Sequence, residues 1–153
     1  MIIWGNHSAT QYVDVNHGHI TDHPVAGLAT PIRSAVNDDA WIRQTFLPAV
    51  QKRGAEVIAA RKLSSAASAA YASAQHVRSW LLGTAPGEIV SMGVVSDGSY
   101  GIPEGLVFSF PVRCVAGNYT IVQGLPIDDF SREQIQITTQ ELVEERDSAL
   151  SFA

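Results

Sequence analysis

The first part of the chain alternates short apolar runs with turn residues. Residues 1–4 are apolar and are followed by Gly5 and Asn6, a pattern typical of a buried strand that ends in a turn. Polar and apolar side chains alternate over residues 11–15, which predicts a second, weaker strand. Glycine and proline recur through residues 16–37, so this stretch is expected to be loop with at most one short strand.

The middle of the chain changes to a helical pattern. Asn37 is expected to cap a helix, because its side chain accepts hydrogen bonds from free amides and the two aspartates after it suit the positive end of the helix dipole. Pro48 lacks an N–H group and should kink or end that helix. A second helix is expected over residues 49–60. Gly54 in its middle costs about 1 kcal/mol relative to alanine, which indicates a packing or access requirement there.

An alanine- and serine-rich segment comes next, at residues 64–82. Alanine has the highest helix propensity, so the segment predicts one helix, which ends at Gly83. Its small side chains would let a neighbouring element approach closely. The alternative is a low-complexity linker, against which Trp80, Leu81 and Leu82 provide an apolar anchor at the end of the segment.

Strand patterns return after this helix. Residues 89–95 predict one strand, and residues 106–115 and 119–122 predict a hairpin. A last helix is expected to begin at Ser131, where Gln134 three residues later completes a capping box. The residues expected on its inner face are Ile135, Leu142, Ala149 and Leu150, and those expected in solvent are Glu141, Glu144, Glu145, Arg146 and Asp147.

The order of strands, helices, strands and helix predicts an α+β domain with an antiparallel sheet. Neither G-x-G-x-x-G after a strand nor G-x-x-x-x-G-K-[ST] occurs in the sequence, so the chain shows no nucleotide-binding apparatus of its own. The first residues resemble a buried strand entered at once, and we therefore expect the chain to begin partway through a larger protein.

Composition narrows the classes of function. The 153 residues fit one domain, and 46% hydrophobic residues suffice for a core. Charged residues make up 16%, below the usual value of about 25%, so a second domain or subunit is expected to cover part of the surface. A net charge of −5 with scattered lysines and arginines argues against binding to nucleic acid or membrane surfaces. Cys114 is the single cysteine, and we expect it to be buried.

Histidines are the main candidates for chemistry. His7 follows the first strand within a small polar turn and is well placed for proton transfer, with a structural or surface histidine as the alternative. His17, His19 and His23 cluster on the glycine- and proline-rich stretch. Without a cysteine or a regular scaffold beside them, we prefer a solvated loop and expect no metal. His76 is interpreted as a surface or packing residue, and a serine hydrolase is disfavoured because no G-x-S-x-G motif occurs.

Six segments together resemble one enzyme family. They are residues 2–16, 51–66, 91–98, 100–103, 109–111 and 124–130. Taken in order, they are similar to the catalytic-histidine half of cytosolic-type, NAD-dependent malate dehydrogenases of the lactate/malate dehydrogenase family. The resemblance covers nearly all 153 residues. It implies the fold of that family's C-terminal domain, an antiparallel sheet with long packed helices, without a Rossmann domain in this chain.

The resemblance also implies the chemistry. Malate and NAD⁺ would be converted reversibly to oxaloacetate and NADH, with His7 accepting and returning the hydroxyl proton. Gly54 and the pair Ser64 and Ser65 would lie close to the bound acid. Close packing remains the alternative explanation for Gly54, and an N-cap role the alternative for Ser64.

Several parts of the family's machinery have no match in this sequence. In the family, the aspartate that pairs with the histidine, the arginines that bind the substrate carboxylates and the NAD-binding Rossmann domain all come earlier in the chain. We therefore expect residues 1–153 to form a C-terminal substrate-binding and catalytic domain that neither binds NAD tightly nor turns over malate alone. A homodimer in the cytoplasm is implied. The alternatives are a lactate dehydrogenase of the same family and a non-catalytic dimerisation module.

Overall fold

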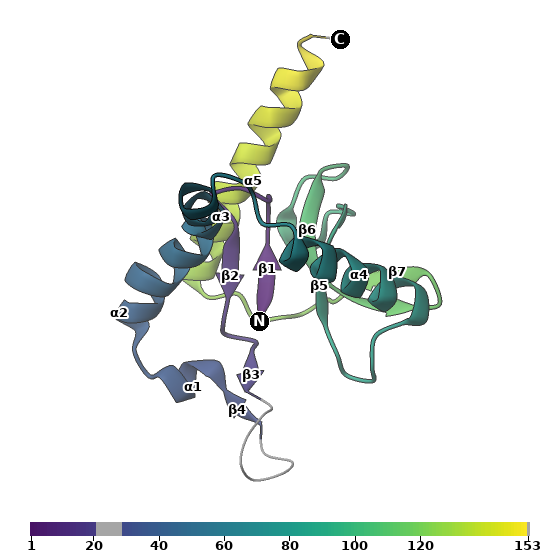
Figure 1. The fold of residues 1–153 in the computed structure, drawn as a ribbon. Coiled ribbons are helices and arrows are strands. Elements are labelled where there is room, and N and C mark those ends of the chain that lie inside the picture. Colours follow the sequence, from purple (N-terminus) through teal and green to yellow (C-terminus); the bar gives the residue numbers. More distant parts are fainter. Residues whose placement is uncertain (21–28, 153) are drawn as a thin grey trace.

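The computed structural model describes residues 1–20 and 29–152. Its centre consists of two antiparallel sheets, one of two strands and one of three in the order β5-β6-β7 (Figure 1). The strands of these sheets are β1 (Ile2–Trp4), β2 (Tyr12–Asp14), β5 (Val90–Val95), β6 (Val107–Val115) and β7 (Asn118–Ile121). The predicted α+β class with antiparallel pairing is confirmed.

The two central sheets are joined where β1 ends. Gly5 and Ser109 exchange backbone hydrogen bonds of 3.3 and 3.0 Å. The Ser109 hydroxyl donates to the carbonyl oxygen of Ile3 at 2.7 Å, and the Ile3 amide donates to the hydroxyl of Ser91 at 2.9 Å. These bonds fix the end of β1, and hence the start of the following loop, against the middle of β6.

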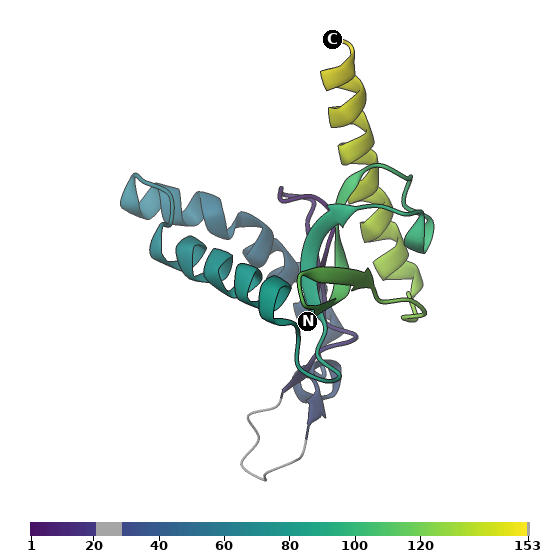
Figure 2. The same cartoon turned by 90° about the vertical axis from the view of Figure 1, so that its right-hand side faces the viewer.

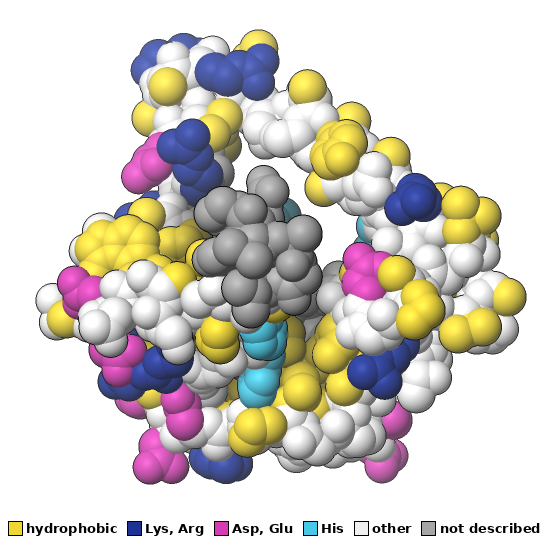
Figure 3. All heavy atoms as spheres, turned by 90° about the horizontal axis from the view of Figure 1, so that it is seen from below, with side chains coloured by type: hydrophobic (Ala, Val, Ile, Leu, Met, Phe, Trp, Pro, Cys, Tyr) yellow, Lys and Arg dark blue, Asp and Glu magenta, His cyan; other side chains and the backbone are white. Residues whose placement is uncertain are grey.

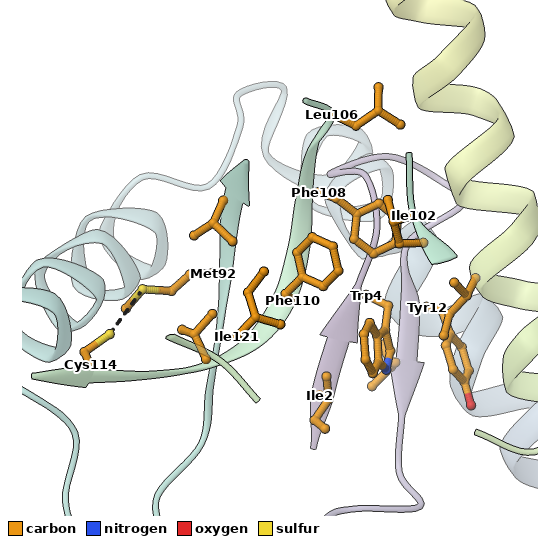
Figure 4. Packing of buried hydrophobic residues seen from close by; sticks show 14 of the residues in the cluster. Ile2, Trp4, Tyr12, Met92, Ile102, Leu106, Phe108, Phe110, Cys114 and Ile121 are labelled. Atoms are coloured by element: carbon orange, nitrogen blue, oxygen red, sulfur yellow. Dashed lines mark hydrogen bonds between the residues drawn. The ribbon is translucent and has the colours of Figure 1, made fainter. Parts of the chain in front are cut away.

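Aromatic and aliphatic residues together fill the core between the sheets (Figure 4). Trp4 and Phe110 are fully buried, with ring centroids 6.4 Å apart in an edge-to-face arrangement, a favoured geometry for aromatic pairs. Cys114 is buried as expected, with its sulfur 3.7 Å from that of Met92. Burial raises the pKa of the Cys114 thiol, so this cysteine is a packing residue.

The described part of residues 16–37 contains more structure than the sequence predicted. Two short paired strands, β3 (His19–Ile20) and β4 (Thr30–Pro31), are followed by the helix α1 (Ile32–Val36). Asn37 does not cap the next helix, which corrects the prediction, because it has a left-handed backbone with φ of 46° and ends α1. Asp38 takes the capping role instead, and its carboxylate accepts a hydrogen bond from the amide of Trp41 at 2.8 Å.

Pro48 does not end the helix around it, which corrects that part of the prediction. A short α2 (Asp39–Trp41) passes into a π-helical turn, η1 (Ile42–Phe46), and then into α3 (Leu47–Arg61). In the π-turn the Leu47 amide bonds to the carbonyl oxygen of Ile42, five residues back. A wider turn moves backbone carbonyls away from the proline ring, which explains how the helix continues through this position.

Helices α3 and α4 (Ala67–Leu82) project to one side of the sheets (Figure 2). Contrary to expectation, α4 begins after Ser64 and Ser65, and its apolar end is not buried: Leu82 is 77% exposed. Trp80 attaches this end of α4 to the rest of the chain, because its indole N–H donates to the carbonyl oxygen of Gly117 at 2.6 Å. Apolar side chains therefore remain on the surface of this projecting part, where Figure 3 shows them in yellow.

The last helix, α5 (Asp129–Leu150), begins two residues before the predicted start. Its cap is Asp128, whose carboxylate accepts a hydrogen bond from the Ser131 amide at 2.7 Å. Ser131 is itself fully buried, and its hydroxyl lies 2.7 Å from that of Tyr12. Burial of Tyr12 raises its pKa to about 12. Ile135 is in the core as predicted, whereas Leu150 at the far end is 65% exposed, which corrects the predicted inner face.

Candidate active site

His7 lies on the loop between β1 and β2, and its side chain is exposed. The loop is folded by local hydrogen bonds: the Gln11 amide donates to the carbonyl oxygen of Ser8 at 3.3 Å, and the Thr10 amide donates to the Ser8 hydroxyl at 3.0 Å. Residues 6–10 thus form a compact polar turn at the end of a buried strand, with the imidazole of His7 facing outward.

A close approach to α5 explains the glycine at the start of this loop. Gly5 has φ of 91°, and a Cβ atom built there would lie 2.2 Å from the Thr138 side chain. Only glycine combines that backbone with that contact without strain. The approach lets the Asn6 amide donate to the hydroxyl of Thr138 at 2.9 Å, so the backbone just before His7 is bonded to α5.

Glu141, one turn further along α5, holds the rest of the loop. Its Oε2 atom accepts hydrogen bonds from the hydroxyls of Ser8 and Thr10, each at 2.5 Å, and from the side-chain amide of Asn6 at 3.1 Å. Burial works to raise the pKa of Glu141, but the three donors outweigh it and hold that pKa below its usual range. The prediction that Glu141 is a solvent charge is therefore wrong.

Helix α3 lies on the other side of the loop. The side-chain amide of Gln51 donates to the carbonyl oxygen of Gln11 at 3.0 Å. Gly54, on the next turn of α3, is exposed, and a Cβ atom built there would meet nothing within 4 Å. Close packing within the described residues therefore does not explain this glycine, which leaves the access explanation.

Ser64 and Ser65 lie in the connection between α3 and α4. The carbonyl oxygen of Ser64 accepts a hydrogen bond from the Arg61 guanidinium at 3.3 Å. The N-cap position of α4 is Ala66, so the N-cap interpretation of Ser64 is wrong. Through residues 1–20 and 29–152, no hydrogen bond joins either serine to the His7 loop. Their role beside the substrate stays a prediction.

The other histidines occupy different surroundings. The Nε2 atom of His17 lies 3.0 Å from the carbonyl oxygen of Pro126 and 3.6 Å from the carboxylate of buried Asp14. His19 is exposed on β3, and His23 lies outside the described residues. Within the described part of the chain, no three His, Cys, Asp or Glu side chains are grouped as metal ligands would be.

The His7 loop presents an exposed imidazole on a backbone that is bonded to α5. An imidazole that is open to solvent on a fixed loop can exchange a proton with a bound molecule. Sequence reasoning proposed His7 as the candidate but missed Glu141, which is separated from Ser8 by 133 positions. The available signal was the alternation of three polar side chains, Asn6, Ser8 and Thr10, which can all donate hydrogen bonds.

Comparison with known proteins places this arrangement in a family. The family model described as lactate/malate dehydrogenase, alpha/beta C-terminal domain, matches residues 1–153. Probable malate dehydrogenase 3 of Dictyostelium discoideum is 60% identical over 152 residues, and cytoplasmic malate dehydrogenase of Medicago sativa is 56% identical over 151 residues. Each alignment covers 99% of this chain but 45% of the relative. The chain thus spans about half the length of the curated relatives it matches.

Solved structures agree with this placement. A malate dehydrogenase from Naegleria fowleri is 46% identical, with a TM-score of 0.82 over 95% of this chain and 42% of that one. A Trichomonas vaginalis lactate dehydrogenase in complex with NADH and oxamate is 35% identical, with a TM-score of 0.88 over 98% of this chain and 45% of that one. Among the residues described, no helix has the length and apolar character required to cross a membrane.

Proposed function

The chain belongs to the lactate/malate dehydrogenase family, and from this premise we propose that it is the C-terminal substrate-binding and catalytic domain of an NAD-dependent malate dehydrogenase. The single observation that carries the proposal is the exposed His7 on a loop fixed to α5, in a chain 53–60% identical to malate dehydrogenases. The substrates are malate and oxaloacetate.

His7 is the proton acceptor and donor in this proposal. When the substrate alcohol is oxidised, its hydroxyl proton passes to a ring nitrogen of His7, and the same nitrogen returns it in the reverse direction. Histidine suits both directions because it gains and loses a proton near neutral pH. The exposure of the side chain supports this role, since a substrate held by other parts of the protein can reach the ring.

NAD is the cofactor of the proposed reaction, in which it supplies the hydride acceptor. A dinucleotide is usually held where a parallel β–α–β unit begins its helix with a glycine-rich turn. The strands of the described residues pair antiparallel, so this part of the chain does not by itself fit the cofactor. We therefore assign no NAD contact to these residues and expect the cofactor to be bound outside them.

Gly54, Ser64 and Ser65 are the proposed substrate-side contacts. The resemblance to the family supports all three, and the open space around Gly54 on α3 supports the first of them, because a ligand can approach the helix backbone there. For Ser64 and Ser65 the resemblance alone carries the proposal.

A homodimer and a cytoplasmic location complete the proposed function. The exposed apolar residues of the projecting helices support association with another subunit or domain; they include Ile58, Val77, Trp80, Leu81 and Leu82. The location rests on relatives that are named as cytoplasmic malate dehydrogenases.

The proposal is tested by NADH oxidation with oxaloacetate and with pyruvate, on a full-length protein that contains these residues and on the 153-residue chain alone. We expect turnover with oxaloacetate in the full-length protein and none in the chain alone. Activity of the isolated chain would contradict our assignment of NAD binding to other residues.

A lactate dehydrogenase is the second candidate. The specific observation in its favour is the TM-score of 0.88 with the Trichomonas vaginalis enzyme. A preference for pyruvate over oxaloacetate in the assay above would favour this candidate. Absence of turnover with both substrates in a folded full-length protein would instead favour a non-catalytic dimerisation module.

A further inference from the structure

We propose that Glu141 is the positioning residue for His7, through the hydrogen bonds that it accepts from residues on both sides of the histidine. The proposal rests on the function proposed above, because it matters for catalysis only if His7 transfers the proton. Glu141 does not touch the substrate in this account. It acts by holding the loop that carries the imidazole.

The bonding pattern is concentrated on one carboxylate oxygen. Asn6 precedes His7, and Ser8 and Thr10 follow it, and all three side chains donate to the same Oε2 atom. Hydrogen bonds to an ionised group are roughly twice as strong as those between neutral groups. Apart from the bridge between Gly5 and Ser109, the loop between β1 and β2 contains neither helix nor strand, so these bonds add to the few local hydrogen bonds that order it.

The element that carries Glu141 is itself well fixed. α5 is a 22-residue helix whose buried residues are Ser131, Ile135 and Thr138. Thr138 lies one turn before Glu141 and accepts the hydrogen bond from the Asn6 backbone. Two successive turns of α5 therefore hold the loop. Thr138 bonds to the Asn6 backbone and lies 2.9 Å from the Thr10 hydroxyl, and Glu141 bonds to three side chains of the loop.

Two other glutamates of α5, Glu145 and Glu144, can be compared with Glu141 in how they bond to the loop. Glu145, one turn beyond Glu141, accepts hydrogen bonds from the side-chain amide of Asn6 at 3.1 and 3.2 Å. Asn6 thus lies between two carboxylates and relieves the repulsion between them. Ser8 and Thr10 bond to Glu141 and not to Glu145 in the described structure. Glu144 is exposed and accepts a hydrogen bond from Gln140 of the same helix.

The order of the loop gives a readout that is independent of turnover. The Thr10 amide donates to the Ser8 hydroxyl, which in turn donates to Glu141. Removal of the carboxylate frees the Ser8 hydroxyl and weakens that amide bond. Hydrogen exchange of a peptide that covers residues 5–12 therefore reports the positioning directly.

The experiment compares Glu141→Ala and Glu141→Gln with wild type in the full-length protein, by steady-state kinetics with NADH and oxaloacetate and by hydrogen exchange. We expect kcat to fall about 10- to 100-fold in Glu141→Ala, because small displacements of a catalytic group cost factors of this size. KM should stay within about twofold if substrate binding is unaffected. Glu141→Gln keeps one acceptor oxygen and should fall between wild type and Glu141→Ala, with exchange of residues 5–12 faster in both variants.

Glu144→Gln is the matched control, because it removes the same charge from an exposed position of the same helix. It should leave kcat and the exchange of residues 5–12 unchanged. Wild-type kcat in Glu141→Ala, or a lower kcat with unchanged exchange, would overturn the positioning role. If Glu141→Ala does not fold, Glu141→Gln decides by the same two measurements. His7→Asn in the same assay separates the two ideas: wild-type turnover there would remove the proposed function, while the exchange result would still decide whether Glu141 holds the loop.

Discussion

The backbone and its contacts at the start of the His7 loop restrict which residues can occupy these positions. Gly5 combines a positive φ with a backbone that lies against Thr138, and the Asn6 amide uses that proximity for its hydrogen bond. The sequence alone indicated a turn at this glycine. It did not indicate that α5, more than 120 positions later, sets the requirement, because one sequence does not show which distant residues come together.

Gly5→Ala should destabilise the protein by at least about 2 kcal/mol, because the methyl group adds both backbone strain and a clash. The measurement is the free energy of unfolding by chemical denaturation. Gly105→Ala is the matched control, since Gly105 also has a positive φ of 83° but has open space around its Cβ position. If the two variants were equally stable, the contact with Thr138 would have no energetic consequence.

At the scale of elements, the strands were predicted well and the helix ends less well. Alternation and turn residues place β5 and β6 within one residue of their observed bounds. The starts of the helices depend on tertiary contacts. Ser131 looks like a cap in sequence but is buried against Tyr12, so that Asp128 becomes the cap. The candidate site shows the same contrast. A family resemblance pointed to His7 from the sequence, whereas the hydrogen bonds from its loop to Glu141 could be found only in the fold.

Asp128→Ala should cost about 1 kcal/mol of stability, which is the usual value of an N-cap side chain. Asp128 also lies 3.4 Å from the guanidinium of Arg33, where both side chains are partly exposed, so that this ion pair adds little. Asp129→Ala removes an acidic residue from the same first turn without removing the cap, and should cost a few tenths of a kcal/mol. Equal losses in thermal or chemical unfolding would show that Asp128 does not act as the cap.

At the scale of the whole molecule, the outer helices α3 and α4 expose several large apolar side chains. The charged fraction of 16% predicted a covered surface, and we propose that this surface includes α4, which has no buried residue. Val77 and Leu81 are one turn apart on α4, and both are about half exposed. Small alanine and serine side chains around them allow another helix to approach closely.

We expect the isolated chain to self-associate through α4 in a concentration-dependent manner. Val77→Glu should weaken this association at least about tenfold, which corresponds to the loss of roughly 1.4 kcal/mol of binding free energy. Sedimentation velocity over a range of protein concentrations measures the effect. Gln75→Glu adds the same charge at an exposed polar position of α4 and should associate as wild type does. A chain that stays monomeric at high concentration would contradict the proposed interface.

The most direct test of the proposed function is the turnover of His7→Asn in a full-length protein that contains this chain. Asparagine keeps a polar side chain of similar size but cannot accept and return the proton. We predict that kcat for NADH oxidation by oxaloacetate falls about 10²- to 10⁴-fold, the usual contribution of a general acid or base, while the affinity for NADH stays unchanged. Turnover at the wild-type rate would contradict the assignment of proton transfer to His7.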